Sequence, residues 1–193
     1  MRTLIGKTWL EPIEGDISEQ DTEAVVTAAH WDLGGGQGTD GSIHFKAGTE
    51  LLRECRGIGG CPIGDAVITS GYNLKARYVI HTVGPVYEEG SDYEAELLTC
   101  ACEGSLRVAT ENGLHTISFP SISTGAFCYP MTLAAPVAVK AIYDWLNNKP
   151  HSLTLVRMVL YKEETLQAYS IYAQALQKLL ARNTLQSGAN LIS

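Results

Sequence analysis

Two kinds of hydrophobic pattern alternate along the chain, short continuous apolar runs and longer stretches with helical periodicity. The run Ala24–Ala29 (AVVTAA) is typical of a strand that is buried on both faces. The stretch Thr165–Ala181 repeats apolar residues at helical spacing and therefore predicts an amphipathic helix. The buried face of that helix is predicted to consist of Leu166, Tyr169, Tyr172, Leu176 and Leu179.

The remaining elements follow from the same two patterns. Further strands are predicted at Thr3–Ile5, Thr8–Ile13, Ala66–Ser70, Tyr78–Gly84, His115–Phe119 and Leu153–Tyr161. Further helices are predicted at Ser42–Arg56, Glu94–Asn112 and Leu133–Asn147.

Capping and breaking residues refine these boundaries. Pro12 favours an edge position for its strand, because proline donates no hydrogen bond to a sheet. Ser18 is predicted to cap a short turn or helix through Asp21–Thr22. Pro130 and Pro136 are predicted to confine the regular part of their helix to its later turns.

The alternation of strands and helices predicts an α/β fold, a sandwich whose mainly parallel central sheet is covered on both faces. Ligands of such sheets bind outside the carboxyl ends of the strands. Two loops follow strands directly: a glycine-rich loop at residues 34–41, and a loop of small and polar residues at Ser121–Tyr129. We therefore expect both loops to reach a single crevice.

Length and charge limit the classes of partner. A chain of 193 residues suits one domain, predicted here to span residues 1–181 and to be followed by a polar, frayed tail at 182–193. The net charge is −7, with 14 Lys and Arg against 21 Asp and Glu. This balance argues against duplex nucleic acid or an anionic membrane as the partner. It does not exclude a small anion as the ligand, bound in an enclosed site. The expected oligomeric state is a monomer.

The sequence predicts a cytoplasmic protein that needs neither metal nor cofactor. Its first residues lack the apolar core of a signal peptide, and no apolar run reaches the roughly 20 residues that span a bilayer. The cysteines are irregularly spaced and odd in number, which favours buried thiols over metal ligands. They are Cys55, Cys61, Cys100, Cys102 and Cys128, the last of which lies beside the second loop.

The first loop is suited to bind phosphate. Glycines let the backbone approach a ligand closely, and the helix that follows presents its N-terminus to the same place. The stretch Gly36–Gly41 also matches G-x-G-x-x-G, the pattern of dinucleotide-binding turns. Four residues separate this loop from its strand, however, and no second strand ends in an acidic residue about 20 positions later. A nicotinamide-dependent dehydrogenase is therefore disfavoured.

The second loop and Asp16 are less specific on their own. The stretch Ser121–Phe127 offers hydroxyls, backbone N–H groups and one aromatic ring, a mixture that can hold a diphosphate and pack on a sugar, but an ordinary strand–helix connection has the same composition. Asp16 can accept a hydrogen bond from an exocyclic base amine, or it can simply cap the turn that follows; spacing alone favours the cap.

Seven stretches, in chain order, carry a resemblance to a known family. They are Gly15–Ile17, Leu33–His44 (LGGGQGTDGSIH), Ala47–Leu52 (AGTELL), Gly60–Asp65 (GCPIGD), Thr69–Leu74 (TSGYNL), Val79–Pro85 (VIHTVGP) and Phe119–Pro130 (FPSISTGAFCYP). Through them nearly the whole chain resembles the macrodomain family, most closely its MacroD-type hydrolase branch.

The resemblance implies a three-layer α/β/α sandwich with a mixed, mainly parallel sheet and a cleft for ADP-ribose. Asp16 would accept from the adenine amino group beside the backbone of Ile17, Phe127 would pack on the distal ribose, and Tyr161 would form an aromatic wall. The residues that would wrap the diphosphate are Gly35, Gly36, Gly38, Ser123, Thr124, Gly125, Ala126 and Phe127.

The resemblance also implies catalytic roles. Asp40 corresponds to the family's catalytic or water-orienting aspartate. His44 lies one helical turn later, where buttressing of the loop is favoured over direct proton transfer. His81 is interpreted as a core residue with its hydrogen bonds satisfied.

The sequence departs from the family pattern in two places. Family members usually carry Asn-Ala-Ala-Asn where this chain has Thr27-Ala28-Ala29-His30. The second Asn normally contacts the distal ribose; the imidazole of His30 keeps a donor and an acceptor but is bulkier and can become charged. Thr27 keeps a hydroxyl and so is the smaller change. The second departure is at Lys162–Thr165, where the MacroD-type branch more often has an acidic residue followed by Glu-Glu-Asn.

Three functions remain in competition. The preferred one is hydrolysis of mono-ADP-ribosyl esters on proteins. In this mechanism no metal is needed, and Asp40, with His30 and His44 beside it, orients the water. The second is a module that reads ADP-ribose without turning it over, a hypothesis that His30 motivates. The third is deacetylation of O-acetyl-ADP-ribose, or action on phosphate esters of ADP-ribose, in the same cleft.

Overall fold

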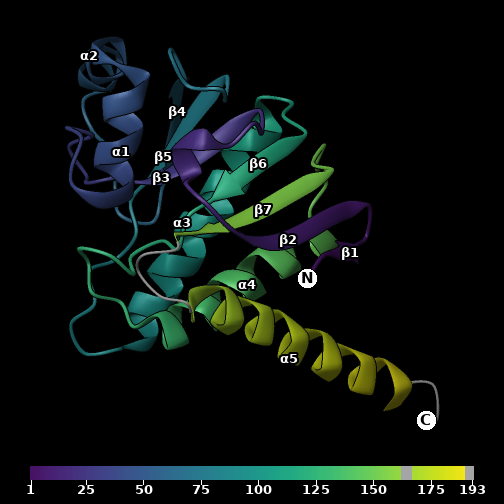
Figure 1. The fold of residues 1–193 in the computed structure, drawn as a ribbon. Helices are drawn as coiled ribbons and strands as arrows, with labels where there is room; N and C mark the ends of the chain where they lie inside the picture. Colours follow the sequence, from purple (N-terminus) through teal and green to yellow (C-terminus); the bar gives the residue numbers. More distant parts are fainter. Residues whose placement is uncertain (162–166, 190–193) are drawn as a thin grey trace.

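Seven strands form one sheet in the order β1-β2-β7-β6-β3-β5-β4 (Figure 1). The computed structural model describes residues 1–161 and 167–189. The strands are β1 (Thr3–Ile5), β2 (Thr8–Glu14), β3 (Ala24–Ala28), β4 (Ala66–Ser70), β5 (Tyr78–Thr82), β6 (Thr116–Phe119) and β7 (Leu155–Leu160). The five inner strands pair in parallel, and β1 and β4 add antiparallel edges.

Helices cover the sheet on both sides, which confirms the predicted α/β sandwich (Figure 1). On one side lie α1 (Gly38–Ala47) and α2 (Thr49–Ile58). On the other lie α3 (Asp92–Glu111), α4 (Met131–Asn148) and α5 (Ala168–Ala189). A single 3-10 turn, η1 (Ile17–Glu19), follows β2.

The alternation of side chains along the strands divides the core in two. On β3, Ala24 and Val26 pack into the larger cluster under α3, α4 and α5, whereas Val25 packs into the smaller cluster under α1 and α2. Both faces of this strand are therefore buried from solvent, as its unbroken apolar run predicts.

Three predicted boundaries are wrong, each for a local reason. The helix predicted at Ser42–Arg56 is two helices, because Gly48 adopts φ 92° between them. Asp16, not Ser18, caps the turn after β2, since its carboxylate accepts from the backbone N–H of Ser18. The last helix continues to Ala189, eight residues into the predicted tail, because residues 182–189 contain no proline and only one glycine.

The structure refines the prediction for Pro12, and it shows that the prediction for Pro130 and Pro136 is wrong. Pro12 lies on β2, which is an inner strand, but β1 ends its pairing at Leu10, so β2 is locally an edge where the proline stands. Pro136 lies inside α4, which begins directly after Pro130. The helix is thus regular from Met131 and forgoes only the one hydrogen bond that Pro136 cannot donate.

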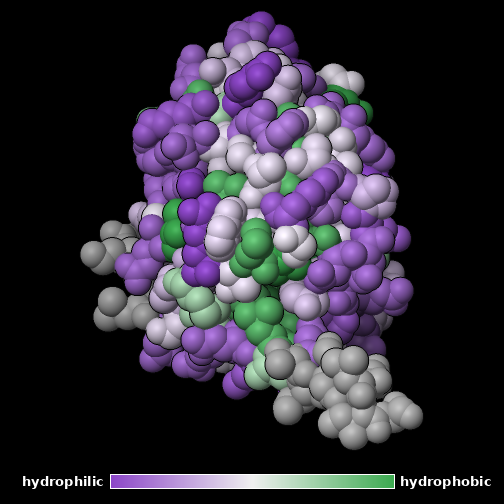
Figure 2. Space-filling view, turned by 90° about the vertical axis from the view of Figure 1, so that its right-hand side faces the viewer, coloured by the Kyte–Doolittle hydropathy of each residue, from purple (hydrophilic) through white to green (hydrophobic). Residues whose placement is uncertain are grey.

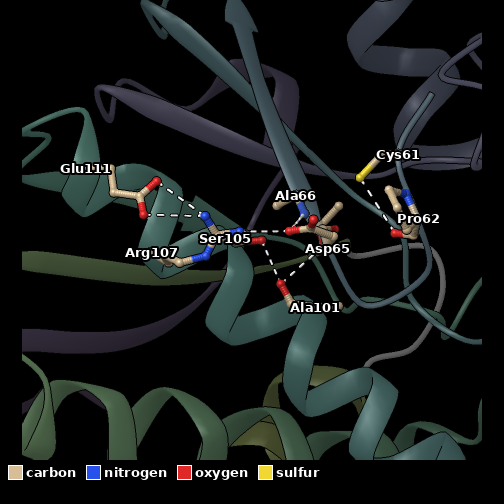
Figure 3. A network of polar contacts seen from close by, with 9 residues as sticks. Cys61, Pro62, Asp65, Ala66, Ala101, Ser105, Arg107 and Glu111 are labelled. Carbon is tan, nitrogen blue, oxygen red and sulfur yellow. Dashed lines mark hydrogen bonds and ion pairs between the residues drawn. The ribbon is translucent and has the colours of Figure 1, made fainter. Parts of the chain in front are cut away.

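Ion pairs hold α3 to the segment before β4 (Figure 3). Arg107 on α3 donates to Asp65 across 2.7 Å and also pairs with Glu111 one turn along the helix. Beneath this pair, the hydroxyl of Thr82 on β5 donates to the carbonyls of Asp65 and Ala101. The edge strand β4 is thereby tied to α3 as well as to β5.

The face drawn in Figure 2 is mostly hydrophilic, and hydrophobic side chains gather near its centre. Of the helices in the described part of the chain, none has both the length and the apolar character to cross a membrane. Three cysteines are buried, as predicted, but Cys100 and Cys128 are exposed.

A small polar group lies inside the otherwise apolar layer between α1, α2 and the sheet. His81 on β5 is completely buried, and its Nε2 atom lies 2.9 Å from the Thr69 hydroxyl and 3.7 Å from the Cys55 thiol. Its Nδ1 atom has no partner among the described residues. His81 is therefore a core residue, as predicted, but only one of its ring nitrogens is satisfied. Burial, with a smaller effect from His44, lowers the pKa of His81 to about 3.

Two helical glycines should respond in opposite ways to alanine. A Cβ at Gly41 in α1 would lie 2.4 Å from the carbonyl oxygen of Gly36, whereas a Cβ at Gly57 in α2 would meet nothing within 4 Å. We expect Gly41→Ala to lower the free energy of unfolding by roughly 1–3 kcal/mol, because the loop must move. Gly57→Ala should raise it by up to about 1 kcal/mol through helix propensity. Urea unfolding measures both, and equal effects would contradict the packing at Gly41.

Acid should weaken the fold through His81. In the unfolded chain this ring takes up a proton near its ordinary pKa of 6.5, but in the folded protein only near 3. The unfolded state thus binds more protons between these values, and stability rises with pH across that window. At about pH 5 the loss should be ~1–2 kcal/mol relative to neutral pH. Urea unfolding of the wild type and of His81→Gln between roughly pH 4 and 8 isolates this contribution, and an identical slope in both proteins would refute it.

Candidate functional site

A cavity of about 490 Å³ opens where the parallel strands end. It is bounded by the segment after β2, the glycine-rich loop before α1, the loop after β6 and the start of α5. Its lining residues are Gly15, Asp16, Ile17, Ala28, Gln37, Gly38, Thr39, Asp40, Ser42, Pro120, Ser121, Ser123, Gly125, Ala126, Phe127, Met131, Val159, Tyr161 and Ala168. The two predicted loops therefore do meet in one crevice.

Three helices begin at this cavity. Gly38, Met131 and Ala168 are the first residues of α1, α4 and α5, and all three line it. The first turn of a helix has N–H groups without intrahelical partners and carries partial positive charge. Among the described lining residues there is no Lys, Arg or His. An anion bound here would be held by backbone N–H groups and helix dipoles rather than by cationic side chains.

Asp40 closes the glycine-rich loop onto the sheet. Its side chain is nearly buried at 3% exposure, yet it lines the cavity. One carboxylate oxygen accepts from the Thr27 hydroxyl at 2.9 Å, and the other accepts from the backbone N–H of Gly36 at 2.8 Å. Each oxygen keeps one further lone pair, so the carboxylate is held in place and can still accept from a ligand or a water.

Thr27, Gly35 and Gly36 do not line the cavity; they act on the loop itself. Thr27 and Gly36 are the two donors to Asp40. Gly35 adopts φ 76°, and a Cβ there would lie 3.0 Å from the ring of His44. The imidazole thus packs directly under the loop, as a buttressing residue does.

His44 also approaches the carboxylate. Its Nε2 atom lies 3.7 Å from an oxygen of Asp40, beyond hydrogen-bond distance, and has no partner among the described residues. His44, Cys55 and His81 bring one ligand atom each to within 4.8 Å of one another, which is a donor set that zinc accepts. However, burial raises the pKa of the Cys55 thiol to about 11, and Thr69 already bonds His81. At neutral pH the Cys55 thiol is therefore protonated, and it contacts His81 within the core.

The second loop is fixed by its own hydrogen bonds. Tyr129 donates its N–H to the carbonyl of Ser123, and the Thr124 hydroxyl donates to the carbonyl of Ser121. The hydroxyl of Ser121 meets that of Tyr172 on α5 at 2.7 Å. Thr124 does not line the cavity, whereas the flanking residues do.

Ser123 is the distinctive residue of this loop. It adopts φ 65°, which is uncommon for a residue with a side chain, and its hydroxyl is buried without a partner among the described residues. A Cβ at Gly84 would lie 2.2 Å from that hydroxyl, so only glycine leaves room for it. A buried, unpaired hydroxyl at the wall of a cavity is a ready donor or acceptor for a ligand.

Asp16 lines the cavity from the segment that follows β2. Its Oδ1 atom accepts from the N–H and the hydroxyl of Ser18, and its Oδ2 atom lies 3.2 Å from Nζ of Lys46. Partial burial by itself raises the pKa of Asp16, but the bonds from Ser18 and Lys46 outweigh it, and the pKa lies below its usual value. Asp16 therefore caps η1 and lines the cavity at the same time.

His30 does not line the cavity that it was predicted to serve. Its Nδ1 atom pairs with Asp32 at 2.8 Å, its ring stacks at an angle on Trp31, and its side chain is about half exposed. It is absent from the cavity lining. The departure at Lys162–Thr165 lies outside the described residues, as does Leu166 of the predicted helix face.

Several lining residues were not predicted from the sequence. Gln37, Thr39 and Ser42 lie within or just after the glycine-rich loop, so their proximity to it was the available indication. Met131, Val159 and Ala168 come from three separate elements and carry no polar group that would mark them. Phe127 and Tyr161 do lie at the cavity, as predicted, and add aromatic surface to it.

Comparison with known proteins agrees with this architecture. Residues 26–138 match the family model of the Macro domain. A macro domain-containing protein of Lactiplantibacillus plantarum is 41% identical over 86% of this chain and 97% of its own length.

Solved structures show the same fold. The Oceanobacillus iheyensis macrodomain, determined with ADP, is 38% identical, covers 94% of this chain and 97% of its own, and superposes with a TM-score of 0.88. A single-residue variant of that macrodomain was determined with ADPR. The Trypanosoma brucei macrodomain in complex with ADP-ribose is 34% identical, covers 86% of this chain and 68% of its own, and has a TM-score of 0.79. By this family model, these identities and this shared fold, the chain belongs to the macrodomain family.

Proposed function

We propose that this protein binds ADP-ribose in the cavity and hydrolyses mono-ADP-ribosyl esters on proteins. The observation that carries the proposal is the placement of Asp40, a carboxylate held in a fixed orientation at the wall of a cavity that three helix N-termini face. ADP-ribose carries a diphosphate that those helix ends suit and a ribose whose anomeric carbon can lie near Asp40.

The macrodomains of Oceanobacillus iheyensis and Trypanosoma brucei support the ligand, because both were determined with ADP or ADP-ribose. In this chain the adenine would lie toward Asp16, the diphosphate between the two loops, and the distal ribose toward Asp40 and Phe127. The unpaired hydroxyl of Ser123 is available to the diphosphate.

Catalysis would need only a positioned water. Asp40 accepts a hydrogen bond from that water and takes its proton as the water oxygen attacks the carbonyl carbon of the ester. The bond from this carbon to the ribose oxygen breaks, and Asp40 returns the proton to the departing ribose oxygen. The products are ADP-ribose and the free carboxylic side chain of the target. General-base assistance of this kind accelerates hydrolysis roughly a hundredfold to ten-thousandfold.

Asp40→Asn separates catalysis from loop structure. An asparagine can still accept from Gly36 and can meet the Thr27 hydroxyl with its amide, so the loop stays closed, but it takes up no proton. We expect release of ADP-ribose from an ester-modified protein to fall about a hundredfold or more. Affinity for ADP-ribose, measured by calorimetry, should change less than about threefold.

The matched control is Glu50→Gln, which removes a carboxylate of α2 that pairs with Arg53 and does not line the cavity. It should leave both turnover and affinity as in the wild type. Full hydrolysis by Asp40→Asn would remove the catalytic assignment, and failure of the wild type to bind ADP-ribose would remove the whole proposal.

The second candidate function is an ADP-ribose reader without turnover. The pairing of His30 with Asp32, away from the cavity, favours it, because the family's asparagine at this position contacts the distal ribose. A reader would bind ADP-ribose in calorimetry and release none in the ester assay. Deacetylation of O-acetyl-ADP-ribose is assayed with the same preparation.

Restoring an amide at this position should favour turnover. We expect His30→Asn to raise ester hydrolysis up to about tenfold, which corresponds to one added hydrogen bond to the reacting ribose. Single-turnover kinetics at saturating enzyme measures this step directly. A rate equal to or below that of the wild type would show that His30 is no obstacle.

A further inference from the structure

The acceptor capacity of Asp16 is almost used up before any ligand arrives. A carboxylate offers about four lone-pair positions, two on each oxygen. Ser18 occupies both positions of Oδ1, with its N–H at 2.8 Å and its hydroxyl at 2.5 Å. Lys46 occupies one position of Oδ2 at 3.2 Å. One acceptor position remains, on the oxygen that Lys46 holds.

Lys46 reaches Asp16 from a different element. It lies in the last turn of α1, and Asp16 precedes η1, so the bond connects segments 30 residues apart. Its Nζ atom also pairs with Glu19 at 2.5 Å, and Glu19 pairs in turn with Lys75 at 2.8 Å. Lys46 and Asp16 are each about one-third exposed, so the pair is partly shielded from solvent.

We propose that Lys46 is a positioning residue that sets the base selectivity of the cavity, by fixing Oδ2 of Asp16 so that a single acceptor faces the ligand. The inference rests on the proposed function, since it takes Asp16 as the group that meets the base. A base with an exocyclic amine donates to that position. A base with an oxo group in place of the amine brings one hydrogen-bond acceptor against another, the oxygen Oδ2 of Asp16, and therefore binds more weakly.

Selectivity of this kind also depends on the charge state of Asp16. A protonated carboxyl can donate to an oxo group, so discrimination requires that Asp16 stay ionised. The bonds from Ser18 and Lys46 act in this direction, because they hold the pKa of Asp16 below its usual value.

A comparison of two ligands tests the role of Lys46. ADP-ribose and its hypoxanthine analogue, inosine diphosphate ribose, have the same diphosphate and sugars and differ in the base. Loss of a positive charge weakens the binding of both ligands equally through the diphosphate. The dissociation constant of the hypoxanthine analogue divided by that of ADP-ribose therefore reports on the base alone. Calorimetry would give this ratio for the wild type, Lys46→Met, Lys46→Arg and Lys75→Met.

We expect Lys46→Met to reduce the preference for ADP-ribose roughly threefold to fivefold, the size of a partly exposed ion pair. Lys46→Arg should restore most of the preference, because it keeps the charge and a donor. Lys75→Met is the matched control: it removes the same charge from the same network, but contacts Glu19 and not Asp16. Its ratio should equal that of the wild type.

Three results would overturn the inference. They are an unchanged ratio in Lys46→Met, a higher ratio in that variant, and an equal fall in Lys75→Met. All three presuppose that the wild type binds ADP-ribose, so they are distinct from failure of the proposed function, in which neither ligand binds the wild type.

Discussion

The carboxylate of Asp40 is the constraint on which the cavity depends. By accepting from Thr27 on β3 and from the N–H of Gly36, it ties a loop of glycines, which would otherwise sample many conformations, to the rigid sheet. The same contact sets where α1 begins and thus where its N-terminus points. A residue that could act in catalysis is therefore also the residue that builds the wall of its own site.

An acidic protein with an anion-binding cavity is no contradiction. None of the lysines and arginines described above lines the cavity: Arg107 pairs with Asp65 at the surface, and Lys46 contacts the lining through Asp16. The helices α1, α4 and α5 begin at the cavity instead, and the first turn of a helix carries a partial positive charge whose effect is short-range. The net charge of −7 then discourages long polyanions while leaving the cavity attractive to one small diphosphate.

The strands and the two loops could be predicted because their information is local. The run Ala24–Ala29 and the glycines at 34–41 are visible in a window of a dozen residues. The break at Gly48 could not be read, because glycine within a helical pattern is ambiguous until its φ is known. Contacts between distant segments, such as Lys46 with Asp16 or the convergence of Val159 and Ala168 on the cavity, depend on the order of strands in the sheet. The side chain of His30 pairs with its neighbour Asp32, and the residue types alone did not indicate whether it would pair there or line the cavity.

The hydrogen bond between Ser121 and Tyr172 has a consequence for the dynamics of the protein. It joins the loop after β6 to α5, the last helix of the chain, and Tyr172 is one of the largest fully buried side chains. Local opening of α5 would therefore release one wall of the cavity together with part of the core. Conversely, a ligand that orders this loop would slow amide hydrogen exchange along α5. Ligand binding in the cavity and the packing of α5 would then belong to one cooperative unit.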